Sequence, residues 1–214
     1  MWRMLRENHD LRRLFVAQVI SYLGDWFSFV ALVGLIDDLT NSSFLVSMIV
    51  VSFSLPSFFA SPIAGVVVDR FDRRRILIIV SLVQSIAALG LVLVGADTIW
   101  LAFVCQSIIS ALAAIVKPAS EAGTPNLARD ATELGKAQAL FGSTWGVMLA
   151  LGAAVGGFFA ATLGRDTAFI INAISFVISA WFMFRISKPL QEERQKVTAR
   201  MRPVADMQIG RAHV

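Results

Sequence analysis

The feature that most constrains this chain is a charged stretch between two long apolar runs. It reads Gly65-Val66-Val67-Val68-Asp69-Arg70-Phe71-Asp72-Arg73-Arg74-Arg75. An arginine at the centre of a bilayer costs roughly 2.5 to 3.5 kcal/mol on insertion scales, so these arginines must lie in water at the end of a membrane span. The positive-inside rule then places the short loop in the cytoplasm, and this orients the spans before and after it.

The composition indicates a polytopic membrane protein. Of 214 residues, 57% are hydrophobic and only 16% are charged, which lies outside the range of ordinary soluble proteins. The chain is predicted to have an N-terminal tail over 1–13, a six-helix transmembrane bundle over 14–186 and a C-terminal tail over 187–214. Apolar runs of spanning length predict six helices, over residues 14–36, 44–68, 76–94, 99–116, 137–163 and 168–184. We expect kinks at Pro56 and Pro62, and a polar loop over 119–136.

The positions of the basic residues predict the topology. All lysines and arginines except Arg165 fall in the two tails or in the connections from span two to three and from span four to five. This bias predicts that both termini are cytoplasmic, in a multi-pass protein of the cell's inner (plasma) membrane. Because the basic residues follow the topology, the net charge of +4 does not indicate a nucleic-acid partner.

The remaining composition excludes several kinds of site. The single cysteine, Cys105, excludes a disulfide framework, and His9 and His213 lie near the ends of the chain. We therefore expect no metal and no cofactor within the membrane. Residues 209–214 resemble the translation of a sequencing adapter. We expect them to be an artefact that cuts the reading frame short, so that six helices are only part of the natural chain.

Asp25 is the one ionisable residue inside a predicted span. Helical spacing places Gln18, Tyr22, Asp25 and Phe29 on one stripe, which could line an aqueous cavity with polar and aromatic groups. A carboxyl in such a cavity can take up and release a proton as its access to water changes. The alternative is structural: Asp25 caps a kink or hydrogen-bonds the backbone of a neighbouring helix.

The fourth and fifth spans each allow two interpretations. Gln106, with its neighbouring serines, either lines the same cavity or hydrogen-bonds another helix. The fifth span has small-xxx-small patterns that predict close packing against a neighbouring helix, and they would also permit sliding or bending if a transporter half rocks. The glycines of these patterns are Gly142, Gly146, Gly152, Gly156 and Gly157.

The pattern Gly65-x-x-x-Asp69-Arg70-x-Asp72-Arg73-Arg74, placed after the second of six spans, resembles the signature loop of the major facilitator superfamily of transporters. Residues 152–157 are similar to the end of that superfamily's antiporter motif, with Ala153 where a proline is usual. The resemblance covers the chain to about Lys188. It implies two inverted three-helix repeats that form the N-terminal half of a twelve-helix transporter.

The resemblance also implies roles for individual residues. Gly24-Asp25 and Asp72 look most like the enterobactin and macrolide exporter branch, although the fourth span lacks the arginine of many drug/proton antiporters. Gly65 would allow a helix of the missing C-terminal half to approach closely. Together with that helix, the loop residues would form a latch for the outward-facing state; they are Gly65, Asp69, Arg70, Asp72, Arg73 and Arg74.

The favoured function is secondary active transport. We expect proton-coupled efflux of a small amphiphilic compound (a drug, macrolide or siderophore) by alternating access, with the substrate, protons and the lipid bilayer as partners. The alternatives are a truncated half-transporter with only a structural or assembly role, and an importer of a small solute. An enzyme is not expected, because the spans contain no histidine, no paired carboxylates and no phosphate-binding loop.

Overall fold

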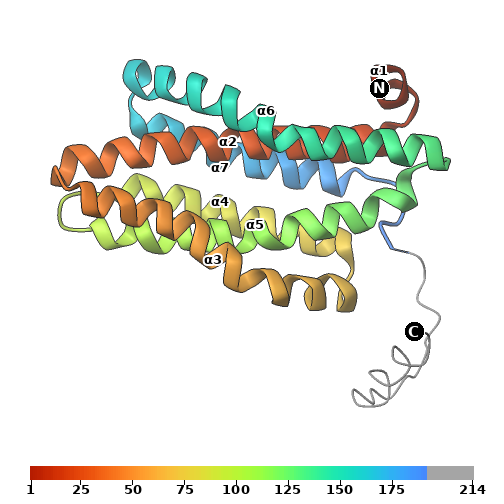
Figure 1. The fold of residues 1–214 in the computed structure, drawn as a ribbon, viewed down its shortest axis with the longest axis horizontal. Coiled ribbons are helices and arrows are strands. Elements are labelled where there is room, and N and C mark those ends of the chain that lie inside the picture. Colours follow the sequence, from red (N-terminus) through yellow and green to blue (C-terminus); the bar gives the residue numbers. More distant parts are fainter. Residues whose placement is uncertain (192–214) are drawn as a thin grey trace, which may run out of the picture.

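The chain folds into an elongated bundle whose successive long helices run in alternating directions along one axis (Figure 1). The structure, a computed structural model, describes residues 1–191. Within that range six helices are long and apolar enough to cross a membrane, which confirms the predicted number of spans. The elements are α1 (Trp2–Glu7), α2 (His9–Thr40), α3 (Ser43–Arg70), α4 (Arg73–Gly90), the 3-10 turn η1 (Leu91–Leu93), α5 (Ile99–Leu127), α6 (Ala131–Leu163) and α7 (Arg165–Phe184).

Polar caps set where most of the long helices begin. In four of them the residue before the helix accepts a hydrogen bond from a backbone N–H three residues further on, which satisfies one of the free donors of the first turn. These caps are Asn8 on α2, Ser42 on α3, Asp72 on α4 and Asp130 on α6. The turn between α6 and α7 uses Gly164, whose φ of 83° suits a residue without a side chain.

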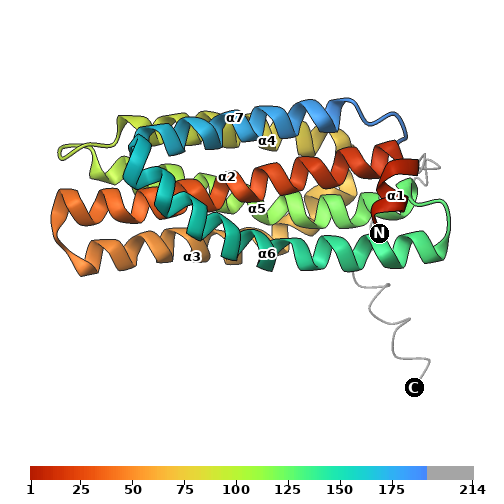
Figure 2. The ribbon, with the colours of Figure 1, turned by 90° about the horizontal axis from the view of Figure 1, so that it is seen from above.

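The contacts between helices follow the symmetry of an inverted repeat. The main partners of α2 are α6 and α7, those of α5 are α3 and α4, and α4 also packs against α7. Exchanging α2 with α5, α3 with α6 and α4 with α7 reproduces this set of contacts. Figure 2 shows the result, with α2 and α5 lying between the pair α4 and α7 and the pair α3 and α6. The two predicted three-helix repeats are therefore visible in the packing.

Within residues 1–191 the buried apolar side chains form two clusters. One contains Leu14 and Leu77 and lies toward the end of the bundle where the chain begins; the other contains Leu32 and Phe169 and lies toward the opposite end. Buried polar side chains separate the two clusters along α2 and α4. Two of them donate to backbone carbonyls of other helices, Gln84 to Ile109 at 3.0 Å and Ser85 to Ala173 at 2.9 Å. The partly buried Ser57 of α3 donates to the Ser110 carbonyl at 2.6 Å.

The polar loop predicted over residues 119–136 is wrong. The helix α5 continues past Pro118 to Leu127, and α6 begins at Ala131. Pro118 lacks an N–H and so frees one carbonyl, but a proline inside a spanning helix is tolerated when neighbouring groups compensate. The small and polar residues after Pro118 were misread as a loop because they lower the local hydropathy, although they pack within the bundle.

Candidate functional site: a pocket beside Asp25

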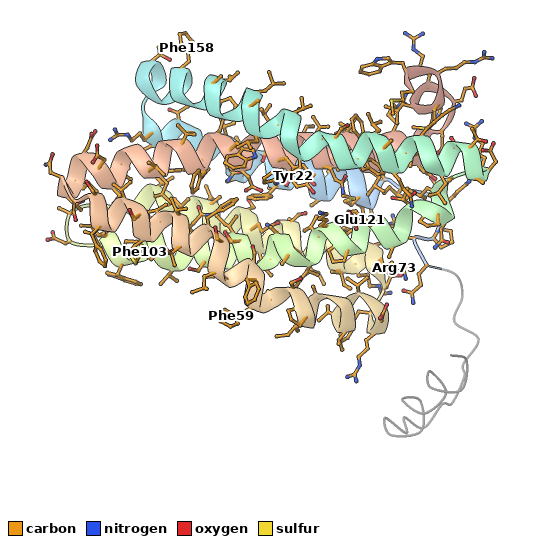
Figure 3. The ribbon with its side chains drawn as sticks, in the orientation of Figure 1. Tyr22, Phe59, Arg73, Phe103, Glu121 and Phe158 are labelled. Atoms are coloured by element: carbon orange, nitrogen blue, oxygen red, sulfur yellow. The ribbon has the colours of Figure 1, made fainter. Side chains whose placement is uncertain are left out.

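A pocket of about 530 Å³ lies between α2, α3 and α5, with Trp145 of α6 at its edge. Its wall combines ionisable, aromatic and small groups: Tyr22, Asp25, Phe53, Ser57, Ser61, Gly65, Ile109, Ser110, Ala113, Ala114, Lys117, Pro118, Glu121 and Trp145. A smaller pocket of about 320 Å³ adjoins it and shares Tyr22, Lys117, Glu121 and Trp145. Figure 3 shows Tyr22 of α2 near the middle of the bundle and Glu121 of α5 nearer the end where the chain begins.

Asp25 connects this pocket to the buried contact between α2 and α7. The residue lines the pocket and is partly exposed, yet its Oδ1 atom is buried and has no hydrogen-bond partner. The side chain of Asn172 on α7 faces the Asp25 carboxyl. The Asn172 Nδ2 atom is also buried and makes no hydrogen bond. Asp25 therefore has water access on one side and a tightly packed polar contact on the other.

Lys117 and Glu121 are pocket residues that the sequence did not reveal. They lie four residues apart on α5, so they share one face of the helix. Both are exposed to the pocket, and neither forms an ion pair within the part of the chain that the structure describes. Sequence reasoning missed them because the predicted fourth span ends at residue 116, before both residues. The i, i+4 spacing of two opposite charges was the signal that could have found them.

Of the other residues predicted for the cavity, Gln18 and Tyr22 line these pockets, whereas Phe29 and Gln106 line neither of the two. Gln18 and Tyr22 line the smaller one, and Tyr22 also lines the larger. Gln106 is buried, and its Nε2 atom donates to the Ser110 hydroxyl at 3.1 Å within the same helix. Ser110, rather than Gln106, lines the larger pocket.

The signature loop lies at the end of α3 and the start of α4. Asp72 caps α4, with its carboxylate accepting from the Arg75 N–H at 2.8 Å. Arg73 donates to the carbonyls of Ala122 at 2.8 Å and Leu190 at 3.1 Å. Arg74 donates to the Phe184 carbonyl and lies over the Phe184 ring. Arg73 and Arg74 are thus hydrogen-bonded to backbone carbonyls of the described residues. In contrast, Gly65 has no heavy atom within 4 Å of its Cβ position, and Arg70 is exposed.

The segment after α7 is held against the same end of the bundle. The carboxylate of Asp10 accepts from the backbone N–H of Ser187 at 3.1 Å and of Lys188 at 3.0 Å, and it pairs with Arg13 at 2.7 Å. Leu190 is buried against Gly123. Arg73 therefore joins the signature loop, α5 and this segment. Because Asp10 lies in a charged N-terminal tail, the sequence gave no signal that it holds the segment after α7.

The glycines of α6 face two different environments. A Cβ at Gly156 would lie 3.0 Å from the Cα atom of Phe27, and one at Gly152 would collide with the Trp26 side chain. Gly157 is in ordinary contact range of Val30. At Gly142 and Gly146 no heavy atom lies within 4 Å of the Cβ position. The second half of the glycine pattern thus lies against α2, whereas Gly142 lines the smaller pocket and Gly146 is exposed.

The family model and the relatives that match this chain point to the same family. Residues 14–211 match the family model of the Major Facilitator Superfamily. An uncharacterized MFS-type transporter of Bacillus subtilis, YfiS, is 29% identical over 182 residues, which are 85% of this chain and 43% of that protein. The putative bacilysin exporter BacE of Bacillus subtilis is 28% identical over 187 residues (86% and 46%), and the multidrug efflux pump Tap of Mycobacterium bovis is 28% identical over 172 residues (76% and 41%).

The chain spans less than half the length of these curated relatives. The family match nevertheless covers most of the chain, and it agrees with the six apolar helices and with the inverted-repeat packing. The chain belongs to the major facilitator superfamily of membrane transporters.

Proposed function

We propose that this chain is the N-terminal half of a secondary active exporter that exchanges protons for a small amphiphilic compound by alternating access. The observation that carries the proposal is the place of Asp25, a carboxyl on the wall of a pocket deep between spanning helices. Both termini then face the cytoplasm, and the protein lies in the inner (plasma) membrane, as the distribution of arginines favours.

Asp25 is suited to carry the proton. An ionised carboxyl is costly in a low-dielectric interior unless it is paired or hydrated, and no ion pair reaches Asp25 within the described residues. When the pocket opens to water, the ionised form is favoured; when the pocket closes, the protonated form is favoured. Asp25 can therefore load a proton on one side of the membrane and release it on the other.

The pocket wall supports an amphiphilic substrate. Tyr22, Phe53 and Trp145 offer flat apolar surfaces, while Lys117 and Glu121 offer charges of both signs. Such a mixture of aromatic surface and a few polar groups is typical of sites for small organic molecules. Export, rather than import, is supported by relatives named as an exporter and as an efflux pump.

The second half of the transporter would cover surfaces that are open here. Phe58 and Phe59 on α3 are 72% and 65% exposed, and the nearby Gly65 has no neighbour within 4 Å of its Cβ position. A helix of the C-terminal half could approach closely at Gly65. We propose that Asp69 and the following loop then complete the latch with that helix, where a carboxylate beside a helix N-terminus gains roughly 0.3 to 1 kcal/mol.

The test uses the full-length protein in proteoliposomes with an imposed proton gradient and ethidium, a fluorescent amphiphilic cation, as the probe. We expect wild-type protein to accumulate the probe against its gradient, and Asp25→Asn to reduce gradient-driven transport to background while the protein still inserts. Asp37→Asn is the matched control, since it makes the same chemical change on the same helix at an exposed position. Unchanged coupling in Asp25→Asn would refute Asp25 as the carrier, and probe movement in the opposite direction would refute export.

A further inference from the structure

Two opposite charges on the pocket walls lack partners within the described residues. Lys117 and Glu121 line both the larger and the smaller pocket, and both residues are exposed. They lie inside α5, before its end at Leu127, and neither forms an ion pair within residues 1–191. A charge inside a spanning helix that faces a cavity instead of a protein partner marks a path for a substrate or an ion.

The order of the two charges along α5 does not favour a pair between them. Residues four apart on a helix have Cβ atoms about 5–6 Å from each other, on one face. A glutamate that precedes a lysine by four residues pairs better than the reverse order, and here Lys117 comes first. The helix therefore presents a cation and a carboxylate side by side to the pocket, and both remain available to a ligand.

The balance of charge on the wall favours a ligand with one charge of each sign. Lys117 is the one cation among the described residues that line the two pockets, and the carboxyls are Glu121 and Asp25. A ligand with only a positive charge would pair with Glu121 and be repelled by Lys117, and a ligand with only a negative charge would meet the reverse. Closing a pocket around an unpaired charge is costly, so a zwitterion fits best while Asp25 carries its proton.

Aromatic rings surround the two charges. Tyr22 and Trp145 line both pockets, Phe53 lines the larger one and Phe141 lines the smaller one. The Trp145 ring packs edge-on against Trp26, with 6.0 Å between the ring centroids, so a neighbour on α2 supports it. These rings offer flat apolar surface beside the charges, as in other sites for small organic molecules.

We propose that these adjoining pockets bind a small zwitterionic amphiphile, which carries an ammonium group and a carboxylate on an apolar or aromatic body. The carboxylate contacts Lys117, the ammonium group contacts Glu121, and the body lies against Tyr22 and Trp145. Short unblocked peptides and amino-acid derivatives belong to this class. The inference rests on the proposed function, because it names the class of substrate for the same site.

The test is isothermal titration calorimetry on the purified full-length protein with three probes that share one skeleton. Alanyl-phenylalanine is a zwitterion at neutral pH, its C-terminal amide is a cation, and its N-acetyl derivative is an anion. We expect the wild-type protein to bind the zwitterion about tenfold more tightly than either derivative, because each derivative loses one charge-assisted contact.

Two substitutions should remove this preference in opposite ways. Lys117→Gln should weaken binding of the zwitterion about tenfold without weakening binding of the amide, so that these two probes bind alike. Glu121→Gln should make the zwitterion and the N-acetyl derivative bind alike. Lys136→Gln is the control: it makes the same change at an exposed lysine that lines neither pocket, and it should leave all three affinities unchanged. A residue that only supports the fold would change all three affinities by the same factor.

Equal affinity of the wild-type protein for the three probes overturns the inference, as does binding of none of them. An equal loss for all three probes in both pocket variants also overturns it. The binding measurement needs no proton gradient, so its failure is separate from that of the proposed function. Gradient-driven ethidium transport that is unchanged in Asp25→Asn overturns the proposed proton coupling instead, whatever the order of the three affinities.

Discussion

Replacing Gly156 by alanine should loosen the contact between α6 and α2. The new Cβ would lie 3.0 Å from the Cα atom of Phe27 and 3.6 Å from its backbone N and O atoms. Because the neighbour is backbone, no side chain can rotate away, and the two helices must separate by several tenths of an ångström. Overpacking of this kind costs about 1–3 kcal/mol. The better helix propensity of alanine offsets up to about 1 kcal/mol of that cost.

The net expectation for Gly156→Ala is a loss of about 1 kcal/mol in the free energy of unfolding, combining the overpacking cost and the propensity gain. The assay is reversible unfolding in detergent micelles titrated with sodium dodecyl sulfate, followed by tryptophan fluorescence. Gly146→Ala is the matched control: it lies on the same helix, but no heavy atom lies within 4 Å of its Cβ position. The control should be neutral or stabilising. If Gly156→Ala unfolds at the same detergent fraction as Gly146→Ala, the close approach of α2 and α6 does not exist.

Two further substitutions test the contacts at the end of the bundle and in its centre. Arg73→Ala removes the hydrogen bonds to the Ala122 and Leu190 carbonyls, so we expect a loss of about 1–3 kcal/mol in the free energy of unfolding and faster tryptic cleavage after Arg185. The exposed Arg75→Ala should change neither measurement. An unchanged cleavage rate in Arg73→Ala would contradict the structure. Gln84→Leu removes the hydrogen bond to the Ile109 carbonyl, and we expect it to lower the free energy of unfolding by about 0.6–1.7 kcal/mol in the same assay. An unfolding midpoint equal to that of the wild type would disprove this.

The sequence predicts best those features of the fold that depend on one segment of the chain alone. The six spans follow from hydropathy because each spanning helix must satisfy its own backbone hydrogen bonds. The start of α4 was predicted at residue 76, three residues late, because the predicted bounds follow the apolar residues alone, whereas the helix begins directly after its cap Asp72. The end of α5 was mispredicted because proline and small residues near the membrane surface look alike whether they form a loop or continue a helix.

The parts of the site that the sequence could not supply depend on partners from distant segments. Asn172 lies more than a hundred residues from Asp25, and only the approach of α7 to Gly24 brings them together. Asp10 is an ordinary acidic residue near the N-terminus until Ser187 and Lys188 present their N–H groups to it. Periodicity predicts which face of a helix is polar, but it does not say which helix that face meets.

The inverted repeat offers an internal comparison that separates structural from functional polar contacts. The contact of α7 with α2 corresponds to that of α4 with α5 when the repeats are exchanged. In the α4–α5 contact the Gln84 amide donates to the Ile109 carbonyl at 3.0 Å. In the α7–α2 contact the Asn172 amide nitrogen lacks such a carbonyl and faces a carboxyl instead. Since the same architecture can satisfy a buried amide, the packing alone does not impose the exception beside Asp25, which agrees with the role proposed for this carboxyl.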